Sequence, residues 1–121
     1  MSNNTNTVLT SISFPSNAYP ANTHIFVSAA VKYPAGSSTS NLWRYTQLSN
    51  SSGVTDSPIN CLWVDNVSMS GNNQYIAHLS GIINIGAFAT PTFYLKAWHN
   101  LGSTVTVSYH IDWVAFGRYD T

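Results

Sequence analysis

Hydrophobic and polar residues alternate with a period of two along several stretches of the chain. The pattern is clearest from Ser103 to Phe116, where one set of alternate positions is almost entirely apolar or aromatic. A two-residue period of this length is typical of a strand with one buried face, because successive side chains of a strand point to opposite sides. The positions expected to face the core are Val105, Val107, Tyr109, Ile111, Trp113 and Ala115.

The same alternation predicts two further strands, His24 to Tyr33 and Thr92 to Trp98. Weaker patterns favour strands at Val8 to Phe14, Leu42 to Leu48, Asn60 to Met69 and Tyr75 to Ile83. Clusters of Ser, Asn, Gly and Pro separate these stretches, as expected for turns. Residues 1–121 are therefore predicted to form a single all-β domain, an antiparallel two-sheet β-sandwich that is jelly-roll-like, with about seven strands. Residues 1–6 are expected to be flexible.

Several positions on the outward side of the predicted strands carry large apolar or aromatic side chains. These are Phe26, Tyr94, Trp98, Val114 and Phe116. Exposed apolar patches tend to mark contact surfaces, and a chain with few charges has little to keep its copies apart. The pattern favours a closed homo-oligomer, and the alternative is that loops of the same chain cover these side chains.

The charge content narrows the classes of partner. Charged residues make up 7% of the chain, and four basic side chains balance four acidic ones. A net charge of zero gives no field to attract phosphate groups, so we expect no nucleic-acid partner. The chain has no apolar stretch of the length that crosses a membrane and its start lacks the pattern of a signal peptide, so we expect no membrane insertion and no such signal.

The acidic and histidine residues give little support to catalysis or metal binding. The four acids are Asp56, Asp65, Asp112 and Asp120, and no two of them form a recognisable pair for glycoside hydrolysis. The histidines show no short metal-ligand spacing. His110 and Asp112 are two residues apart on one strand face, an arrangement more typical of a surface pair than of a catalytic triad. The sequence therefore predicts no enzyme, no catalytic residue, no metal and no cofactor.

Two segments near the end of the chain carry a family resemblance. The stretch from Phe93 to Asn100, followed by Val105 to Gly117, resembles the end of an H-type lectin domain. The ending from Trp113 to Arg118 is also similar to that of receptor-binding tips of bacteriophage tail fibres. Both resemblances imply a small β-sandwich that recognises a cell surface, commonly as a homotrimer. The lectin resemblance implies a sugar site at Trp98 and His99, with Arg44 on an earlier strand.

A separate physical argument points to the same kind of ligand. Sugars present an apolar face and a rim of hydroxyl groups, so their sites need an aromatic platform and fixed hydrogen-bonding groups. The candidate ligand-binding residues are Trp98, His99, Asn100, Tyr94 and Arg44. The alternative is that Trp98 and Tyr94 only fill a contact between subunits.

The function expected from the sequence is a non-enzymatic receptor-binding head of a phage tail fibre that recognises cell-surface carbohydrate as a homotrimer. Its expected location is the virion, at the fibre tip, or the extracellular space after release. The alternatives are a free-standing H-type-like lectin and a purely structural virion or shell β-sandwich without a ligand.

Overall fold

A computed structural model describes ten parts of the chain. They are residues 1, 5–14, 23–35, 41–42, 44–50, 58–64, 69–70, 74–87, 91–101 and 104–116. Side chains are described for all of these except 41–42, 58–64, 69–70 and 87. The strands are β1 (Thr7–Ser13), β2 (His24–Tyr33), β3 (Asn41–Leu42), β4 (Arg44–Ser49), β5 (Pro58–Val64), β6 (Met69–Ser70), β7 (Tyr75–Asn84), β8 (Thr92–His99) and β9 (Ser108–Phe116), with a short 3-10 helix, η1 (Ile85–Ala87).

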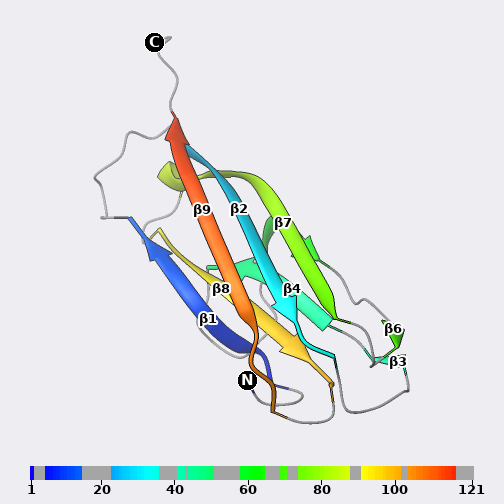
Figure 1. The fold of residues 1–121 in the computed structure, drawn as a ribbon. Coiled ribbons are helices and arrows are strands. Elements are labelled where there is room, and N and C mark those ends of the chain that lie inside the picture. The colour runs from blue at the N-terminus through cyan, green and yellow to red at the C-terminus, as the bar shows by residue number, and fades with distance from the viewer. Residues whose placement is uncertain are drawn as a thin grey trace.

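The strands form two main sheets that pack face to face (Figure 1). One is four-stranded with the order β1-β8-β4-β5, and the other is three-stranded with the order β7-β2-β9. The short strands β3 and β6 pair separately. Every pair in the described part of the chain is antiparallel. The predicted all-β, two-sheet sandwich is confirmed.

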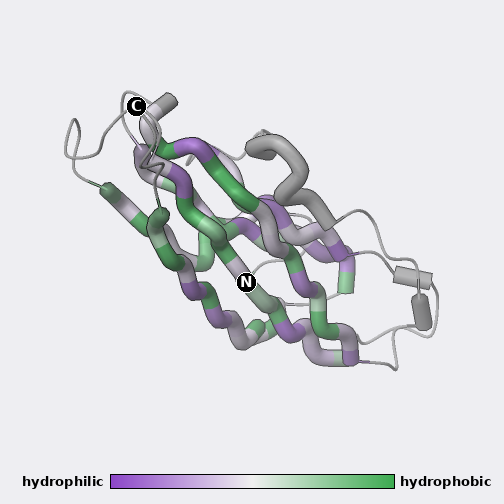
Figure 2. Tube along the Cα trace, turned by 90° about the horizontal axis from the view of Figure 1, so that it is seen from above, coloured by the Kyte–Doolittle hydropathy of each residue, from purple (hydrophilic) through white to green (hydrophobic). Residues whose placement is uncertain are grey.

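Strand β2 lies at the centre of the three-stranded sheet and follows the predicted alternation. Its core-facing residues Ile25, Val27 and Val31 are buried, whereas Phe26, Ser28 and Lys32 are exposed on the outer face. The alternation of hydrophobic and hydrophilic positions is visible along the tube in Figure 2. Hydrophobic burial on one side of a pleated strand therefore fixes which face of this sheet meets the other.

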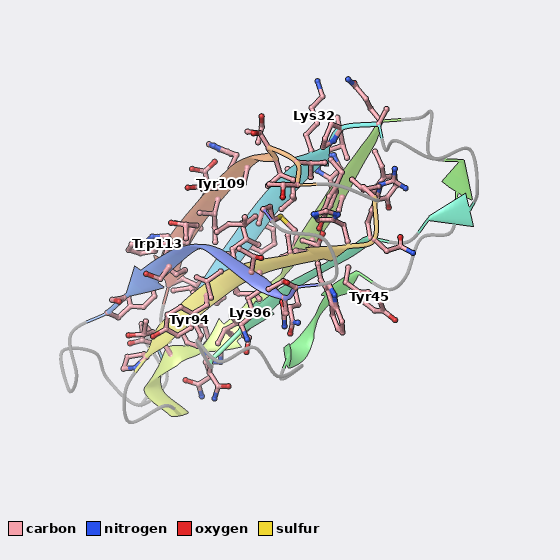
Figure 3. All side chains as sticks on the ribbon, turned by 90° about the horizontal axis from the view of Figure 1, so that it is seen from below. Lys32, Tyr45, Tyr94, Lys96, Tyr109 and Trp113 are labelled. Atoms are coloured by element: carbon pink, nitrogen blue, oxygen red, sulfur yellow. The ribbon has the colours of Figure 1, made fainter. Side chains whose placement is uncertain are left out.

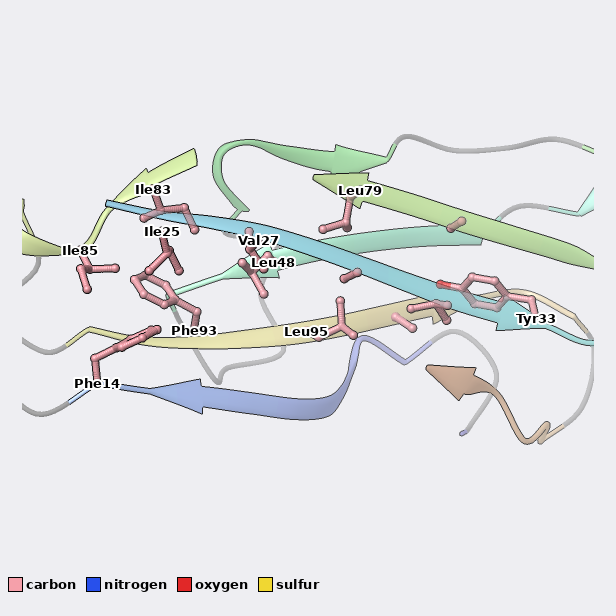
Figure 4. Close-up of a cluster of buried hydrophobic side chains, with 14 of the residues drawn as sticks. Phe14, Ile25, Val27, Tyr33, Leu48, Leu79, Ile83, Ile85, Phe93 and Leu95 are labelled. Atoms are coloured by element: carbon pink, nitrogen blue, oxygen red, sulfur yellow. The ribbon is translucent and has the colours of Figure 1, made fainter. Parts of the chain in front are cut away.

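The core lies between the two sheets (Figure 4). From the four-stranded sheet, Leu48 of β4 and Phe93 and Leu95 of β8 are fully buried. Phe14 lies at one end of this core and Tyr33 at the other. The predicted inward positions of the Thr92 to Trp98 stretch are thus confirmed.

The strand ends differ from the sequence-based prediction in three places. The strand expected from Ser103 begins only at Ser108, because residues 104–107 are described without strand pairing. The stretch predicted from Leu42 divides into β3 and β4, and the one predicted from Asn60 divides into β5 and β6. No helix in the described ranges is long and apolar enough to span a membrane.

Strand β9 is less buried on its core-facing side than its neighbour β2. In the register with β2, Trp113 lies opposite Val27 and Tyr109 opposite Val31, so both point toward the core side as predicted. However, Val27 and Val31 are fully buried, whereas Trp113 and Tyr109 are 45% and 47% exposed. The expectation that this flank of β9 is buried is therefore wrong for Tyr109 and Trp113, which lie on an edge strand of the sheet, whereas Ile111 between them is partly buried and packs against the core.

Candidate functional site

The outer face of the four-stranded sheet carries two aromatic side chains next to each other. Tyr45 of β4 lies opposite Trp98 of β8 in the strand register, and their ring centroids are 5.7 Å apart at an interplanar angle of 33°. Both side chains are half-buried. Figure 3 shows Tyr45 on this sheet, well away from Tyr109 and Lys32 of the other. We call Tyr45 and Trp98 the aromatic pair.

The backbone beneath the aromatic pair is held by a buried tyrosine. The Tyr33 hydroxyl donates to the Tyr45 carbonyl oxygen at 2.6 Å and is 2.7 Å from the Thr46 hydroxyl. Burial raises the pKa of Tyr33, and hydrogen bonds from Thr46 and from the Trp98 backbone offset only part of this effect. The phenol therefore stays protonated at neutral pH and holds both strands that carry the pair.

Gln47 follows Tyr45 on the same outer face of β4. Its side chain is 1% exposed, and neither its amide oxygen nor its amide nitrogen has a hydrogen-bond partner in the described part of the chain. Buried polar groups are nearly always hydrogen-bonded, so a side chain with both atoms unpaired needs an explanation. Gln47 offers one acceptor and two N–H donors beside the aromatic pair.

Tyr94 lies on the same outer face of β8 as Trp98, but not in the same place. Four residues along a strand separate positions by roughly 13 Å, so the two rings cannot stack on one sugar ring. Lys96 lies between them and is fully buried, opposite Gln47. Figure 3 shows Tyr94 and Lys96 along this strand. The structure therefore separates Tyr94 from the aromatic pair.

Arg44 and His99 lie on the inner face of the same sheet. They are opposite each other in the register of β4 and β8, and both are buried. Burial lowers the pKa of Arg44, and the nearby phenols of Tyr33 and Tyr75 oppose this shift. A ligand at Trp98 would lie on the opposite face, so these two predicted residues do not join it. Asn100, which directly follows β8, is half-buried.

His99 connects the start of the chain to the turn after β8. Its Nδ1 accepts from the Leu101 backbone N–H at 3.1 Å, so its Nε2, 3.3 Å from the Met1 carbonyl oxygen, carries the proton and donates. The Met1 amino group also donates to the Val105 carbonyl oxygen at 2.8 Å. Burial lowers the pKa of His99, with smaller contributions from the amino terminus and Arg44. These contacts make His99 a structural residue.

The outer face of the three-stranded sheet carries the predicted histidine–aspartate pair. His110 Nε2 and Asp112 Oδ2 are 2.5 Å apart, and both side chains are largely exposed. His78, Ala30 and His110 lie in one row across this sheet, above a shallow hollow of about 330 Å³. No group of three metal-ligating side chains occurs among the described residues. Asp56, Asp65 and Asp120 lie outside the described side chains.

Sequence reasoning missed Tyr45 and Gln47. The signal was present, since Arg44, Thr46 and Leu48 alternate with Tyr45, Gln47 and Ser49. However, both sets mix polar and apolar residues, so the period alone does not say which set faces the core. Only the register with β8 places Tyr45 beside Trp98. No protein-family model, no curated protein and no solved structure matches this chain.

Proposed function

We propose that this protein is a non-enzymatic recognition domain that binds cell-surface carbohydrate and acts as a homo-oligomer. The setting that the sequence resemblance implies is the receptor-binding head of a phage tail fibre, with a free-standing H-type-like lectin as the alternative. The proposed site consists of the aromatic pair, Gln47 and Asn100, which lies two residues after Trp98. Arg44, His99 and Tyr94 are left out of it because of where their side chains lie.

The observation that carries the proposal is the aromatic pair beside a buried amide without a described partner. Two tilted rings give an apolar surface on which the C–H face of a sugar can rest. Gln47 is 1% exposed, so ligand binding must first uncover its amide, which can then accept from one hydroxyl of the sugar and donate to another. Because the strands beneath are fixed by Tyr33, the rings lose little freedom when a ligand binds.

A second candidate function, a structural β-sandwich of a virion or shell without a ligand, is favoured by a different observation. Val114 and Phe116 are 59% and 46% exposed on the outer face of β9. Large apolar side chains in solvent are typical of surfaces that meet another protein. In this candidate function, the aromatic pair would also be a protein contact.

A glycan array with the wild-type protein tests the proposal, followed by titration of the best ligand against variants. Trp98→Ala and Tyr45→Ala should each weaken binding at least tenfold, which is about 1.4 kcal/mol. Phe116→Ala is the matched control, since it removes a half-exposed ring from the other sheet and should leave the affinity unchanged. Binding that survives Trp98→Ala and Tyr45→Ala would refute this site, and an array without any binder would favour the structural candidate.

A further inference from the structure

Strand β9 is an edge strand with a long open side. It pairs with β2 from Ser108 to Phe116, and no strand in the described part of the chain pairs with its other side. An edge of this kind presents a row of backbone N–H and C=O groups that can extend the sheet with another strand. Figure 1 shows β9 at the margin of its sheet, beside β2.

Both faces of β9 also carry exposed apolar side chains. Tyr109 and Trp113 project on the core side, where Trp113 makes an edge-to-face contact with Phe14 at 4.8 Å but remains half-exposed. Val114 and Phe116 project on the outer side. A single copy of the chain therefore leaves apolar surface in water on both sides of the same strand, which is unfavourable.

The strand lacks the features that natural edge strands use to prevent pairing. Between Ser108 and Phe116 there is no proline, lysine or arginine, and β9 pairs with β2 without a bulge. The one charged residue of β9, Asp112, is bonded to His110 of the same strand. Lysines, prolines and bulges are the usual protection of an exposed edge. The absence of these features from β9 indicates an edge that pairs with another strand.

We propose that β9 pairs antiparallel with β9 of a second copy, about a two-fold axis at Ile111. This inference rests on the proposed homo-oligomer and names its contact surface. The two three-stranded sheets then form one continuous sheet across the dimer, with the cores of both sandwiches on the same side. An interface about a two-fold axis uses the same surface of both copies, so this surface must be complementary to itself. If one residue contacts a second residue of the other copy, that second residue contacts the first in the same way across the axis.

The register centred on Ile111 has this self-complementarity. On the outer face it sets His110 opposite Asp112 of the second copy, and Asp112 opposite that copy's His110. On the core side it sets Tyr109 opposite Trp113, so that two aromatic pairs flank two facing Ile111 side chains. A carboxylate opposite a hydrogen-bonding imidazole and a pair of aromatic rings are both cross-strand neighbours that stabilise a sheet.

Neighbouring registers lose these contacts. Centring the axis on Asp112 sets two aspartates directly opposite each other, which is destabilising. Centring it on His110 sets two histidines opposite each other and sets Asp112 opposite Ser108 of the second copy. Centring it on Trp113 sets Asp112 and His110 opposite apolar side chains. The order of polar and aromatic side chains along β9 therefore selects both the occupant, a second copy, and its register.

The first test is the mass of the protein in solution, measured by sedimentation velocity over a range of concentrations. We expect twice the 13.2 kDa mass of the chain. Ile111→Lys, which puts two positive charges on the axis, should give the monomer. Ile76→Lys is the control on β7, the other edge strand of the same sheet, and the dimer should persist in it. Because Ile111 is partly buried against the core, circular dichroism must show that the Ile111→Lys monomer is folded.

A cysteine cross-link tests the register itself. Ile111→Cys should form a covalent dimer under mild oxidation, because directly opposite residues have Cα atoms close enough for a disulfide. Asp112→Cys should not, because its counterpart would lie two positions further along the strand, beyond disulfide reach. The wild type controls for the native Cys61.

Each outcome decides the proposal. A monomer, a dimer unaffected by Ile111→Lys, or cross-linking through position 112 in place of 111 overturns the β9 pairing. A stable trimer overturns it too, while leaving a carbohydrate-binding homo-oligomer intact. Conversely, a β9-paired dimer that binds no sugar on the glycan array supports this inference and refutes the proposed function.

Discussion

Replacing Gln47 by methionine should make the protein more stable and less able to bind its ligand. Methionine has nearly the length of glutamine, is unbranched and fills irregular buried space. It removes two polar atoms that are buried and lack a described hydrogen-bond partner. A residue kept for binding at the expense of stability should show this pair of opposite effects.

The size of the gain follows from the cost of an unpaired buried amide. Leaving such a group without a hydrogen bond costs about 1–3 kcal/mol, so we expect Gln47→Met to raise the free energy of unfolding by about 1–2 kcal/mol. In a domain of this size that corresponds to an increase in Tm of roughly 4 °C per kcal/mol. Affinity for the best glycan should fall about tenfold, because the hydrogen bonds of the amide are lost.

Urea unfolding followed by circular dichroism measures the change, with Thr46→Val as the control. Thr46 neighbours Gln47 in β4 but is hydrogen-bonded to Tyr33. Its replacement should therefore lower the free energy of unfolding by about 1 kcal/mol, the net contribution of one hydrogen bond. If Gln47→Met is as stable as the wild type or less stable, the Gln47 amide is satisfied within the folded chain and its proposed role is refuted.

Two further predictions concern stability alone. Burial lowers the pKa of His99 below its ordinary value of 6.5. Below that pH the unfolded chain therefore binds a proton more readily than the folded chain does. The free energy of unfolding should have its maximum contribution from His99 above pH 6.5 and decrease as the pH falls below it. His99→Gln should lose this part of the pH dependence, and an unchanged urea titration between pH 7.5 and 5 would contradict the assignment. At concentrations where the protein is monomeric, Trp113→Ala should cost only about 1–2 kcal/mol, because the side chain is 45% exposed in a single copy, whereas Phe93→Ala should cost about 3–5 kcal/mol. Equal losses in thermal unfolding of the two variants would show that the β9 flank is covered.

The fold could be predicted from the sequence to the extent that burial follows a period of two. In β2 every core-facing residue is buried, so polarity and burial agree at every second position. In β9 the same period gives the right side for Trp113 but not its exposure, because exposure depends on what lies opposite and not on the strand itself. Local pattern carries no information on where a sheet ends.

The candidate site was harder to predict than the fold. Trp98 and His99 are adjacent in sequence, yet the pleat sends them to opposite faces of the sheet, where Trp98 is half-buried and His99 is fully buried. Tyr45 is far from Trp98 along the chain and becomes its neighbour only through the pairing of β4 with β8. Strand register across a sheet is a long-range property, and it decides which of these side chains share a surface.

The most direct test of the carbohydrate site is an NMR titration of the labelled protein with the best ligand from the glycan array. The account predicts that the indole N–H signal of Trp98 and the side-chain amide signals of Gln47 shift together and saturate with the same affinity. Shifts confined to the three-stranded sheet, with Trp98 and Gln47 unchanged at saturating ligand, would contradict it.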